Sequence, residues 1–241
     1  MESERAVKVW AWIAAAHKGD GPVSVAAVCL AAVRWLGVDG ASVIAVGGVV
    51  AREPLFASDR LSARLEELLV TTGEGPGAED FRFGSPLLVA DLESSAAQWP
   101  GFVPAAVAAG ARAMFALPLQ AGAIQVGVLS LYRALPGPLT AGELADVLVF
   151  ADIALAMVLD AAAGISGSPE YRPLDGLSDS RAEVYQATGM ISVQLGVSLE
   201  EAFVRLRAHA FAAGTALDDV AGDVVKRLLR FAPDPPTNVI P

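Results

Sequence analysis

The sequence has few of the residues that form metal and redox sites. Its 241 residues include one cysteine and two histidines. A single cysteine, Cys29, permits neither an internal disulfide nor a cysteine-based metal cluster. His17 and His209 lie far apart in the sequence, without the short spacing of paired zinc ligands. We therefore expect no metal and no cofactor, and we interpret Cys29 as a core residue of an apolar helix.

The common catalytic motifs are also missing. The sequence contains no G-x-S-x-G, no H-E-x-x-H, no paired-cysteine motif and no histidine with an evident carboxylate partner. We predict no catalytic residues, and an enzyme is the least favoured class of function.

An uninterrupted hydrophobic run of membrane-spanning length is missing too. The longest apolar stretch, residues 144–164, contains Asp146, Asp152 and Asp160. An aspartate near the centre of a bilayer costs about 2.5–3.5 kcal/mol, so this stretch predicts a buried or dimer-forming helix of a soluble protein. The N-terminus is acidic and lacks the apolar core of a secretory signal. We expect a cytoplasmic protein that does not bind membranes.

Positive charge is scarce, and the formal net charge is −10. The charge is unevenly spread, because six basic residues balance six acidic residues between positions 181 and 231. The acidic excess therefore belongs to the rest of the chain. A neutral segment still binds phosphate when its cations share one face, with weaker long-range attraction than a basic protein has.

The clearest break in the chain is GISGSPEYRPLDGLSDS, residues 164–180, which is rich in Gly, Ser, Pro and Asp. Such a composition between two helical patterns predicts a linker. It separates a first domain, residues 1–163, from a smaller second domain, residues 181–231, and a proline-rich tail follows at 232–241.

The first domain mixes predicted helices and strands. Helices are expected at about 5–18, 23–36, from a Ser58 cap to about 70, near 102–109, and from a Thr140–Glu143 capping box to about 163. Strands are expected at 41–48, 86–92, 111–119 and 123–133, of which the last two form an antiparallel hairpin. This order predicts an α+β fold with an antiparallel sheet and packed helices, rather than a doubly wound parallel sheet.

The second domain has the pattern of three short amphipathic helices. The first covers about 181–195 and stops at Gly196, the second has a Ser198–Glu201 capping box and ends at Gly214, and the third is capped by Thr215. The expected buried faces contain Val184, Ala187 or Thr188, Ile191 and Leu195, then Leu199, Ala202, Phe203, Leu206 and Ala210, then Leu217, Val220, Ala221, Val224 and Leu228. They predict a compact all-α bundle.

Several segments of the first domain resemble the GAF half of bacterial GAF-ANTAR regulators. They are SDRLSARLEELLVTTGEGPG, FRFGSPLLVADL, Trp99-Pro100, FALPL, VGVLSLYR and GPLTAGELADVLVFAD. The resemblance covers most of residues 20–160 and implies a GAF-like sensor that buries a small molecule, or nothing, between its sheet and covering loops. Many relatives have a cysteine after GEGP, where this chain has Gly77. The candidate ligand-binding residues are Phe81, Phe83, Trp99, Phe102 and Phe115, with ordinary core packing as the alternative.

The second domain resembles the ANTAR domain, whose pattern is A-x-G-x-[LIM], then Ala, LR and Ala, then L-x-x-VA. The matching residues are Ala187, Gly189 and Ile191, then Ala202, Leu206, Arg207 and Ala210, then Leu217, Val220 and Ala221. One departure is Thr188, where many members have lysine. The resemblance implies a transcription antiterminator that binds hairpin loops of RNA, often as a dimer.

The bundle has residue types suited to unpaired nucleotides, whose base edges are exposed in loops. On a helical wheel, Arg207 lies on one side of the apolar stripe, and Arg205 and His209 lie toward the other. Gly189 allows close approach of a nucleotide or, alternatively, close helix packing. The candidate RNA-binding residues are Arg181, Gln186, Thr188, Gly189, Arg205, Arg207, His209, Lys226 and Arg227.

The charged candidates also have structural interpretations. Lys226, Arg227 and Arg230 lie near the predicted end of a helix, where the macrodipole favours positive charge. Arg207 is alternatively part of a salt bridge, and His209 is alternatively an ordinary surface residue.

Two functions of different classes follow. The first is an RNA-binding antitermination regulator, which we expect to be a homodimer because the helix that ends near 163 is apolar nearly all round and needs cover. The second is a ligand-sensing or dimerisation scaffold that acts through a protein partner without RNA; Thr188 and the neutral bundle favour it.

Overall fold

The computed structural model describes residues 2–18, 23–47, 51–76, 78, 84–122, 124–162 and 177–232. The described residues form two compact units, the first within 2–162 and the second within 177–232. Each unit has its own core and is described separately.

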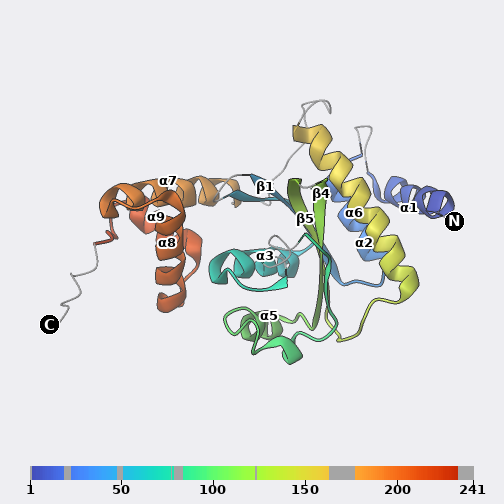
Figure 1. The fold of residues 1–241 in the computed structure, drawn as a ribbon, viewed down its shortest axis with the longest axis horizontal. Helices are drawn as coiled ribbons and strands as arrows, with labels where there is room; N and C mark the ends of the chain where they lie inside the picture. Colours follow the sequence, from blue (N-terminus) through green and yellow to red (C-terminus); the bar gives the residue numbers. More distant parts are fainter. Residues whose placement is uncertain are drawn as a thin grey trace. The chain divides into compact units, whose positions relative to one another are not determined.

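The first unit is an antiparallel sheet with helices on both faces (Figure 1). Its elements in chain order are α1 (Glu2–Ala16), α2 (Val25–Trp35), β1 (Gly40–Gly47), β2 (Ala51–Ala57), α3 (Arg60–Thr72), β3 (Leu87–Val89), a 3₁₀ helix (Glu93–Ser95), α5 (Val103–Ala109), β4 (Ala113–Ala121), β5 (Ile124–Arg133) and α6 (Ala141–Ala162). The strand order is β2-β1-β5-β4-β3, and every neighbouring pair is antiparallel. The predicted α+β class and the β4–β5 hairpin are confirmed.

The two faces of the sheet carry separate cores. Helices α1, α2 and α6 cover one face, and α3 and α5 lie on the other (Figure 1). Cys29 and Phe150 belong to the core of the first face, where Cys29 is fully buried. Leu65 and Leu69 belong to the core under α3 and α5. The interpretation of Cys29 as a core residue therefore agrees with its position.

Strand β2 is not among the strands expected from the sequence, and Pro54 lies inside it. Proline cannot donate to a strand ladder and is tolerated at sheet edges and bulges. Here β2 is an edge strand, and its register with β1 is irregular next to the Ile44–Pro54 pair. The position of Pro54 therefore satisfies both conditions.

The cap of α3 differs from the prediction by one residue. Asp59, rather than Ser58, is the N-cap, and its carboxylate accepts a hydrogen bond from the backbone N–H of Ser62 at 2.9 Å. The hydroxyl of Ser58 accepts from the N–H of Ala41 and donates to Asp59. Both residue types are good caps, and Ser58 instead joins the helix start to β1.

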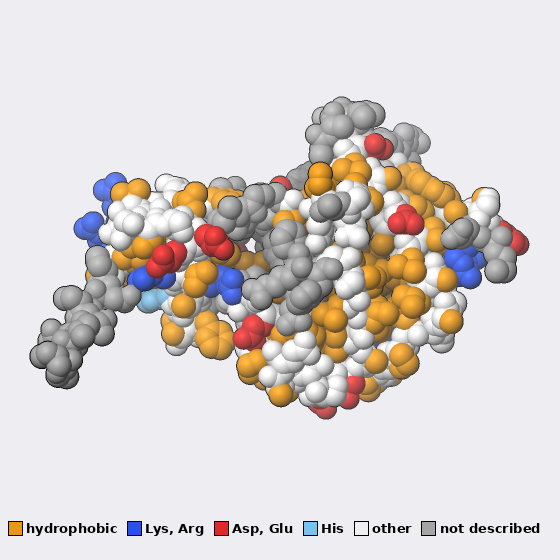
Figure 2. Space-filling model, viewed as in Figure 1, with side chains coloured by type: hydrophobic (Ala, Val, Ile, Leu, Met, Phe, Trp, Pro, Cys, Tyr) orange, Lys and Arg blue, Asp and Glu red, His pale blue; other side chains and the backbone are white. Residues whose placement is uncertain are grey.

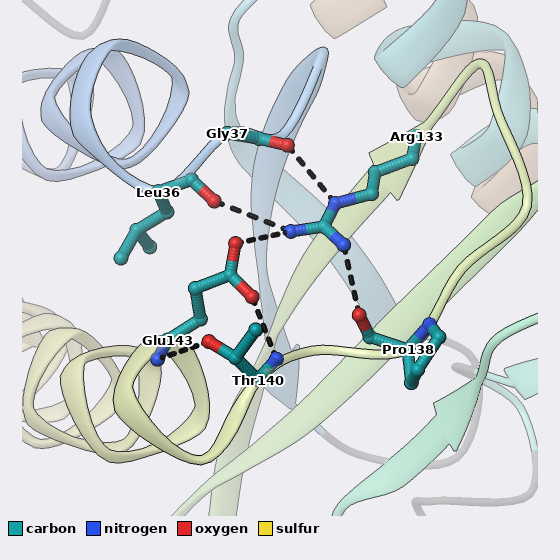
Figure 3. Close-up of polar contacts among 6 residues, drawn as sticks. All are labelled: Leu36, Gly37, Arg133, Pro138, Thr140 and Glu143. Atoms are coloured by element: carbon teal, nitrogen blue, oxygen red, sulfur yellow. Dashed lines mark hydrogen bonds and ion pairs between the residues drawn. The ribbon is translucent and has the colours of Figure 1, made fainter.

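The start of α6 confirms the predicted capping box. The N–H of Glu143 donates to the Thr140 hydroxyl at 3.2 Å, and the N–H of Thr140 donates to the Glu143 carboxylate at 2.6 Å. Arg133, at the end of β5, pairs with Glu143 at 2.7 Å and donates to the carbonyls of Leu36, Gly37 and Pro138 (Figure 3). One guanidinium thus ties the ends of α2 and β5 to the start of α6.

Helix α6 receives most of its cover from its own chain. It packs against α1, α2 and the sheet, and its buried Asp146 forms ion pairs with Arg5 and Lys8 of α1. The structure therefore does not require a partner subunit to cover most of this helix. Leu148 and Leu159 stay exposed on α6, and hydrophobic side chains gather in this region of the surface (Figure 2). None of the described helices is long and apolar enough to cross a membrane.

The second unit is a three-helix bundle of α7 (Leu177–Leu195), α8 (Leu199–Ala213) and α9 (Leu217–Val225). Helix α7 begins four residues before the expected start at 181, so its first turn lies in the segment expected to be a linker. Ser198 caps α8 through the N–H of Glu201, and Gly214 ends it, as predicted.

Helix α9 corrects two predictions. Its N-cap is Ala216, which makes no side-chain cap, so Thr215 does not cap it. It ends at Val225, so Leu228 is not part of its apolar face and lies exposed instead. The remaining predicted core positions of α9 are buried.

Candidate functional site

One face of α7 points away from the bundle core. Val184, Ala187 and Ile191 are buried, whereas Tyr185 and Gln186 are exposed on the opposite side of the helix. Gly189 follows Tyr185 by one turn and is therefore on the same side. We call Tyr185, Gln186 and Gly189 the α7 face.

Gly189 has no packing role among the described residues. A Cβ built on it meets no atom within 4 Å, so a larger residue would fit the isolated bundle. Close helix packing, the structural alternative for this glycine, is therefore not supported among the described residues. The backbone of α7 is open to approach at this position.

Thr188 faces the opposite way and corrects one site prediction. Its side chain is buried, and its hydroxyl donates to the carbonyl of Val184 at 2.7 Å. Threonine commonly bonds back to the preceding turn of a helix in this way. The hydroxyl is thus engaged inside the bundle rather than presented to a ligand, and we remove Thr188 from the candidate contacts.

The charged candidates on α8 contact other residues of the bundle. Arg205 pairs with Glu201 one turn earlier at 3.0 Å, and Arg207 lies over the ring of Phe203 at 5.7 Å from its centroid. His209 is exposed and meets the edge of Phe231, with 5.4 Å between ring centroids. These contacts fix the direction of each side chain and leave Arg205 and Arg207 part-exposed.

The basic residues near the end of α9 lie in the turn that follows the helix. Lys226 is the C-cap, and Arg227 has a left-handed backbone with φ of 62°, a conformation that favours glycine. The N–H of Leu228 donates to the carbonyl of Asp223 at 2.8 Å, which closes the turn. Lys226, Arg227 and Arg230 are all exposed.

The other site predictions for this unit have mixed outcomes. Arg181 lies in α7, but its side chain is outside the described residues. The sequence interpretation missed Tyr185, although its position one turn before Gly189 was a usable signal. On the side of the second unit visible in Figure 2, basic side chains lie among acidic and hydrophobic ones rather than in one continuous patch.

The predicted ligand residues of the first unit do not form one group. Phe81 and Phe83 lie outside the described residues. Trp99 and Phe102 are fully buried in the core under α3 and α5, with no exposed surface to offer. Phe115 packs in the core on the opposite face of the sheet, because successive residues of β4 alternate between faces. Phe115 therefore cannot line a pocket with Trp99 and Phe102.

Comparison with known families identifies the second unit. Residues 176–225 match the model of the ANTAR domain. No relative was found among curated proteins.

Solved structures resemble the first unit. The GAF domain of a phosphoenolpyruvate-protein phosphotransferase from Coxiella burnetii is 15% identical, with a TM-score of 0.51, and the match covers 67% of this chain and 95% of that chain. The GAF domain of the Acinetobacter phosphoenolpyruvate-protein phosphotransferase is 11% identical, with a TM-score of 0.48, and the match covers 68% of this chain and 96% of that chain. At this identity the first comparison establishes the fold alone. The chain therefore contains an ANTAR domain at residues 176–225, and its first unit has the fold of GAF domains.

Proposed function

We propose that this protein is an RNA-binding transcription antitermination regulator, whose ANTAR domain recognises unpaired nucleotides of hairpin loops through the α7 face. The observation that carries the proposal is the open backbone at Gly189. Glycine inside a helix costs about 1 kcal/mol relative to alanine. Because no neighbour in the bundle requires it, a molecule that approaches from outside explains it best.

The neighbours of Gly189 suit a base. The exposed ring of Tyr185 offers a surface on which an unpaired base stacks, and stacking on an aromatic side chain contributes about 1–3 kcal/mol per base. The amide of Gln186 both donates and accepts hydrogen bonds, as the edge of a base requires. Loops present such bases, whereas paired stems do not.

The cations supply phosphate contacts in this proposal. The residues proposed to contact phosphate are Arg181 on α7, Arg205, Arg207 and His209 on α8, and Lys226 and Arg227 in the turn after α9. Arg205 and Arg207 also contact other residues of the bundle, and both remain part-exposed. Because the domain is neutral overall, we expect a smaller salt dependence than that of a strongly basic protein.

The first unit acts as the regulatory half in this proposal. We propose that it binds a small molecule or joins two copies of the chain, without catalysis, in the cytoplasm. Val7 and Trp10 on α1 and Leu148 and Leu159 on α6 are exposed hydrophobic residues that support a homodimer. The domain limits 1–163 and 181–231, with the linker and tail between and after them, belong to the same proposal.

Titration of the full-length chain with labelled RNA tests the function. The probe is an RNA with two short hairpins, and its matched control has the same stems closed by covalent linkers without loop nucleotides. We expect tighter binding to the looped RNA at moderate salt, by about tenfold or more. Equal affinity for both RNAs would overturn loop recognition.

A scaffold that acts through a protein partner is the second candidate. Val204 and Phe211 lie exposed on α8 and favour it. This alternative predicts that Phe211→Ser abolishes regulation in a transcription-readthrough assay while looped and loop-free RNAs bind equally. The RNA proposal predicts the reverse, with Gly189 substitutions abolishing readthrough.

A further inference from the structure

A buried carboxylate lies under α3 in the GAF unit. Glu66 is only 3% exposed, and one of its oxygens accepts a hydrogen bond from the hydroxyl of Ser42 at 2.8 Å. Its other oxygen, Oε2, has no hydrogen-bond partner among the described residues. The hydroxyl of Ser130, also buried, has none either. Buried polar atoms are nearly always paired, so two orphans need an explanation.

The two serines lie side by side on the sheet. Ser42 on β1 pairs directly with Ser130 on β5, so both side chains point to the same face. Ala57 on β2 is the other partner of Ser42, and Ala116 on β4 is the other partner of Ser130. Four neighbouring strands thus present four small side chains at one level, on the face where Ser42 meets Glu66. All four side chains are buried, so a group bound there would be shielded from water.

The charge of Glu66 is not balanced within the described part of the chain. No ion pair there involves Glu66, and its one hydrogen bond comes from a neutral hydroxyl. A buried charge is tolerated when it is paired with an opposite charge and fully hydrogen-bonded. Burial raises the pKa of the Cys29 thiol, and the negative charge of Glu66 raises it further. A thiol has no cationic form, so Cys29 does not balance the charge of Glu66 in either of its protonation states.

We propose that Glu66, Ser42 and Ser130 bind the ammonium group of a small primary amine. An ammonium group carries one positive charge and three N–H donors. One N–H serves Oε2 of Glu66, a second serves the Ser130 hydroxyl, and the third serves the Ser42 hydroxyl, whose own proton is donated to Glu66. Water would satisfy these hydrogen bonds without balancing the charge of Glu66, whereas an ammonium group does both. This site lies in the GAF unit and does not depend on RNA binding.

Thermal unfolding of the full-length chain tests the site. The probe is methylammonium chloride, compared with sodium chloride and tetramethylammonium chloride at equal ionic strength. We expect methylammonium to raise the Tm of the wild-type chain in a saturable way, because a ligand that binds only the folded state stabilises it. Tetramethylammonium has no N–H donor and should have no saturable effect.

Glu66→Gln is the main variant, and Glu67→Gln on the exposed side of α3 is its matched control. We expect Glu66→Gln to lose the methylammonium response, with the half-saturating concentration raised about tenfold or more, since a charge-assisted contact is removed. Without amine, the variant should melt at a higher temperature than the wild type, because its amide can donate to Ser130 and no charge is buried. Glu67→Gln should respond like the wild type.

Three results would overturn the proposal. They are identical melting of the wild type in all three salts, an equal methylammonium response in Glu66→Gln, and a lower Tm of Glu66→Gln in the absence of amine. If Glu66→Gln does not fold, Ser130→Ala replaces it, and an undiminished response in that variant counts against the site.

Discussion

The hydroxyl of Thr188 donates a hydrogen bond to the carbonyl of Val184, one turn earlier in α7, at 2.7 Å. Its neighbour Gly189 is open to the outside, so adjacent residues of one helix serve different purposes. Thr188 is buried and hydrogen-bonded by the bundle itself, without a contribution from RNA. The absence of the common lysine here therefore does not exclude RNA binding by the rest of the face.

Thr188→Val is expected to leave RNA affinity within about twofold, since it keeps the shape of a buried side chain that does not reach the ligand. The free energy of unfolding should change by no more than about 1 kcal/mol, because the lost hydrogen bond is offset by a buried methyl group. Filter-binding titration and denaturant unfolding measure the two quantities. A tenfold loss of affinity at unchanged stability would place the hydroxyl at the RNA.

Arg227→Gly should make the protein more stable and bind RNA less well. The left-handed backbone at Arg227 suits glycine, so the substitution should add about 1 kcal/mol to the free energy of unfolding of the second unit. If Arg227 contacts a phosphate, the slope of log affinity against log salt should fall by about 1. Arg227→Lys keeps the charge and the strained backbone, and it should resemble the wild type in both measurements.

Asp146→Asn should destabilise the GAF unit. The carboxylate holds Arg5 and Lys8 of α1 against α6, and its removal leaves two cations without this partner. Because both cations are partly exposed, we expect a cost of about 1–3 kcal/mol, below that of a fully buried pair. The exposed Arg64–Glu67 pair provides the comparison, and Glu67→Gln should cost less than about 0.5 kcal/mol. If both substitutions lower the free energy of unfolding by the same amount, Asp146 contributes no more than an exposed ion pair does.

Acid should destabilise the GAF unit through Asp59. Burial alone would raise its pKa, but hydrogen bonds from the Ser62 N–H and from the hydroxyls of Ser58, Ser62 and Tyr132 outweigh burial and lower the pKa. A carboxylate whose pKa is lower in the folded state stabilises the protein above its unfolded pKa, near 3.9, and this stabilisation is lost as the pH falls through the folded value. Asp59→Asn should therefore flatten the decline in stability below about pH 4. Urea titrations at several pH values measure it, and an unchanged slope would contradict this role.

Much of the fold could be predicted because hydrophobic period, caps and turns agree along the chain. The capping-box spacing left one choice of N-cap residue at Thr140–Glu143 and one at Ser198–Glu201. Both caps form as expected. The sequence was ambiguous where two suitable residues are adjacent, as with Ser58 and Asp59. Strand β2 was missed because the effect of Pro54 depends on whether the strand lies at an edge, which only the complete sheet reveals.

The site was less predictable, because function depends on which side of an element a residue faces. The helical period left the choice between Ala187 and Thr188 open, and the structure buries both. Phe115 was grouped with Trp99 by residue type, although the alternation of β4 places it on the other face. Glu66 is one of two adjacent acidic residues in α3, and residue type alone does not distinguish the buried carboxylate from its part-exposed neighbour Glu67.

The proposed RNA recognition depends on the α7 face around Gly189. The most direct test measures unfolding free energy and affinity for the looped RNA on the same samples of wild type, Gly189→Ala and Gly189→Leu, with Thr188→Val as the control. Both Gly189 variants should gain up to about 1 kcal/mol of stability, through better helix propensity at a position where an added Cβ meets no described atom within 4 Å. Their RNA affinity should fall, more for leucine than for alanine, and by about tenfold or more for leucine. Stable Gly189 variants that bind the looped RNA as tightly as the wild type would show that this face does not recognise RNA.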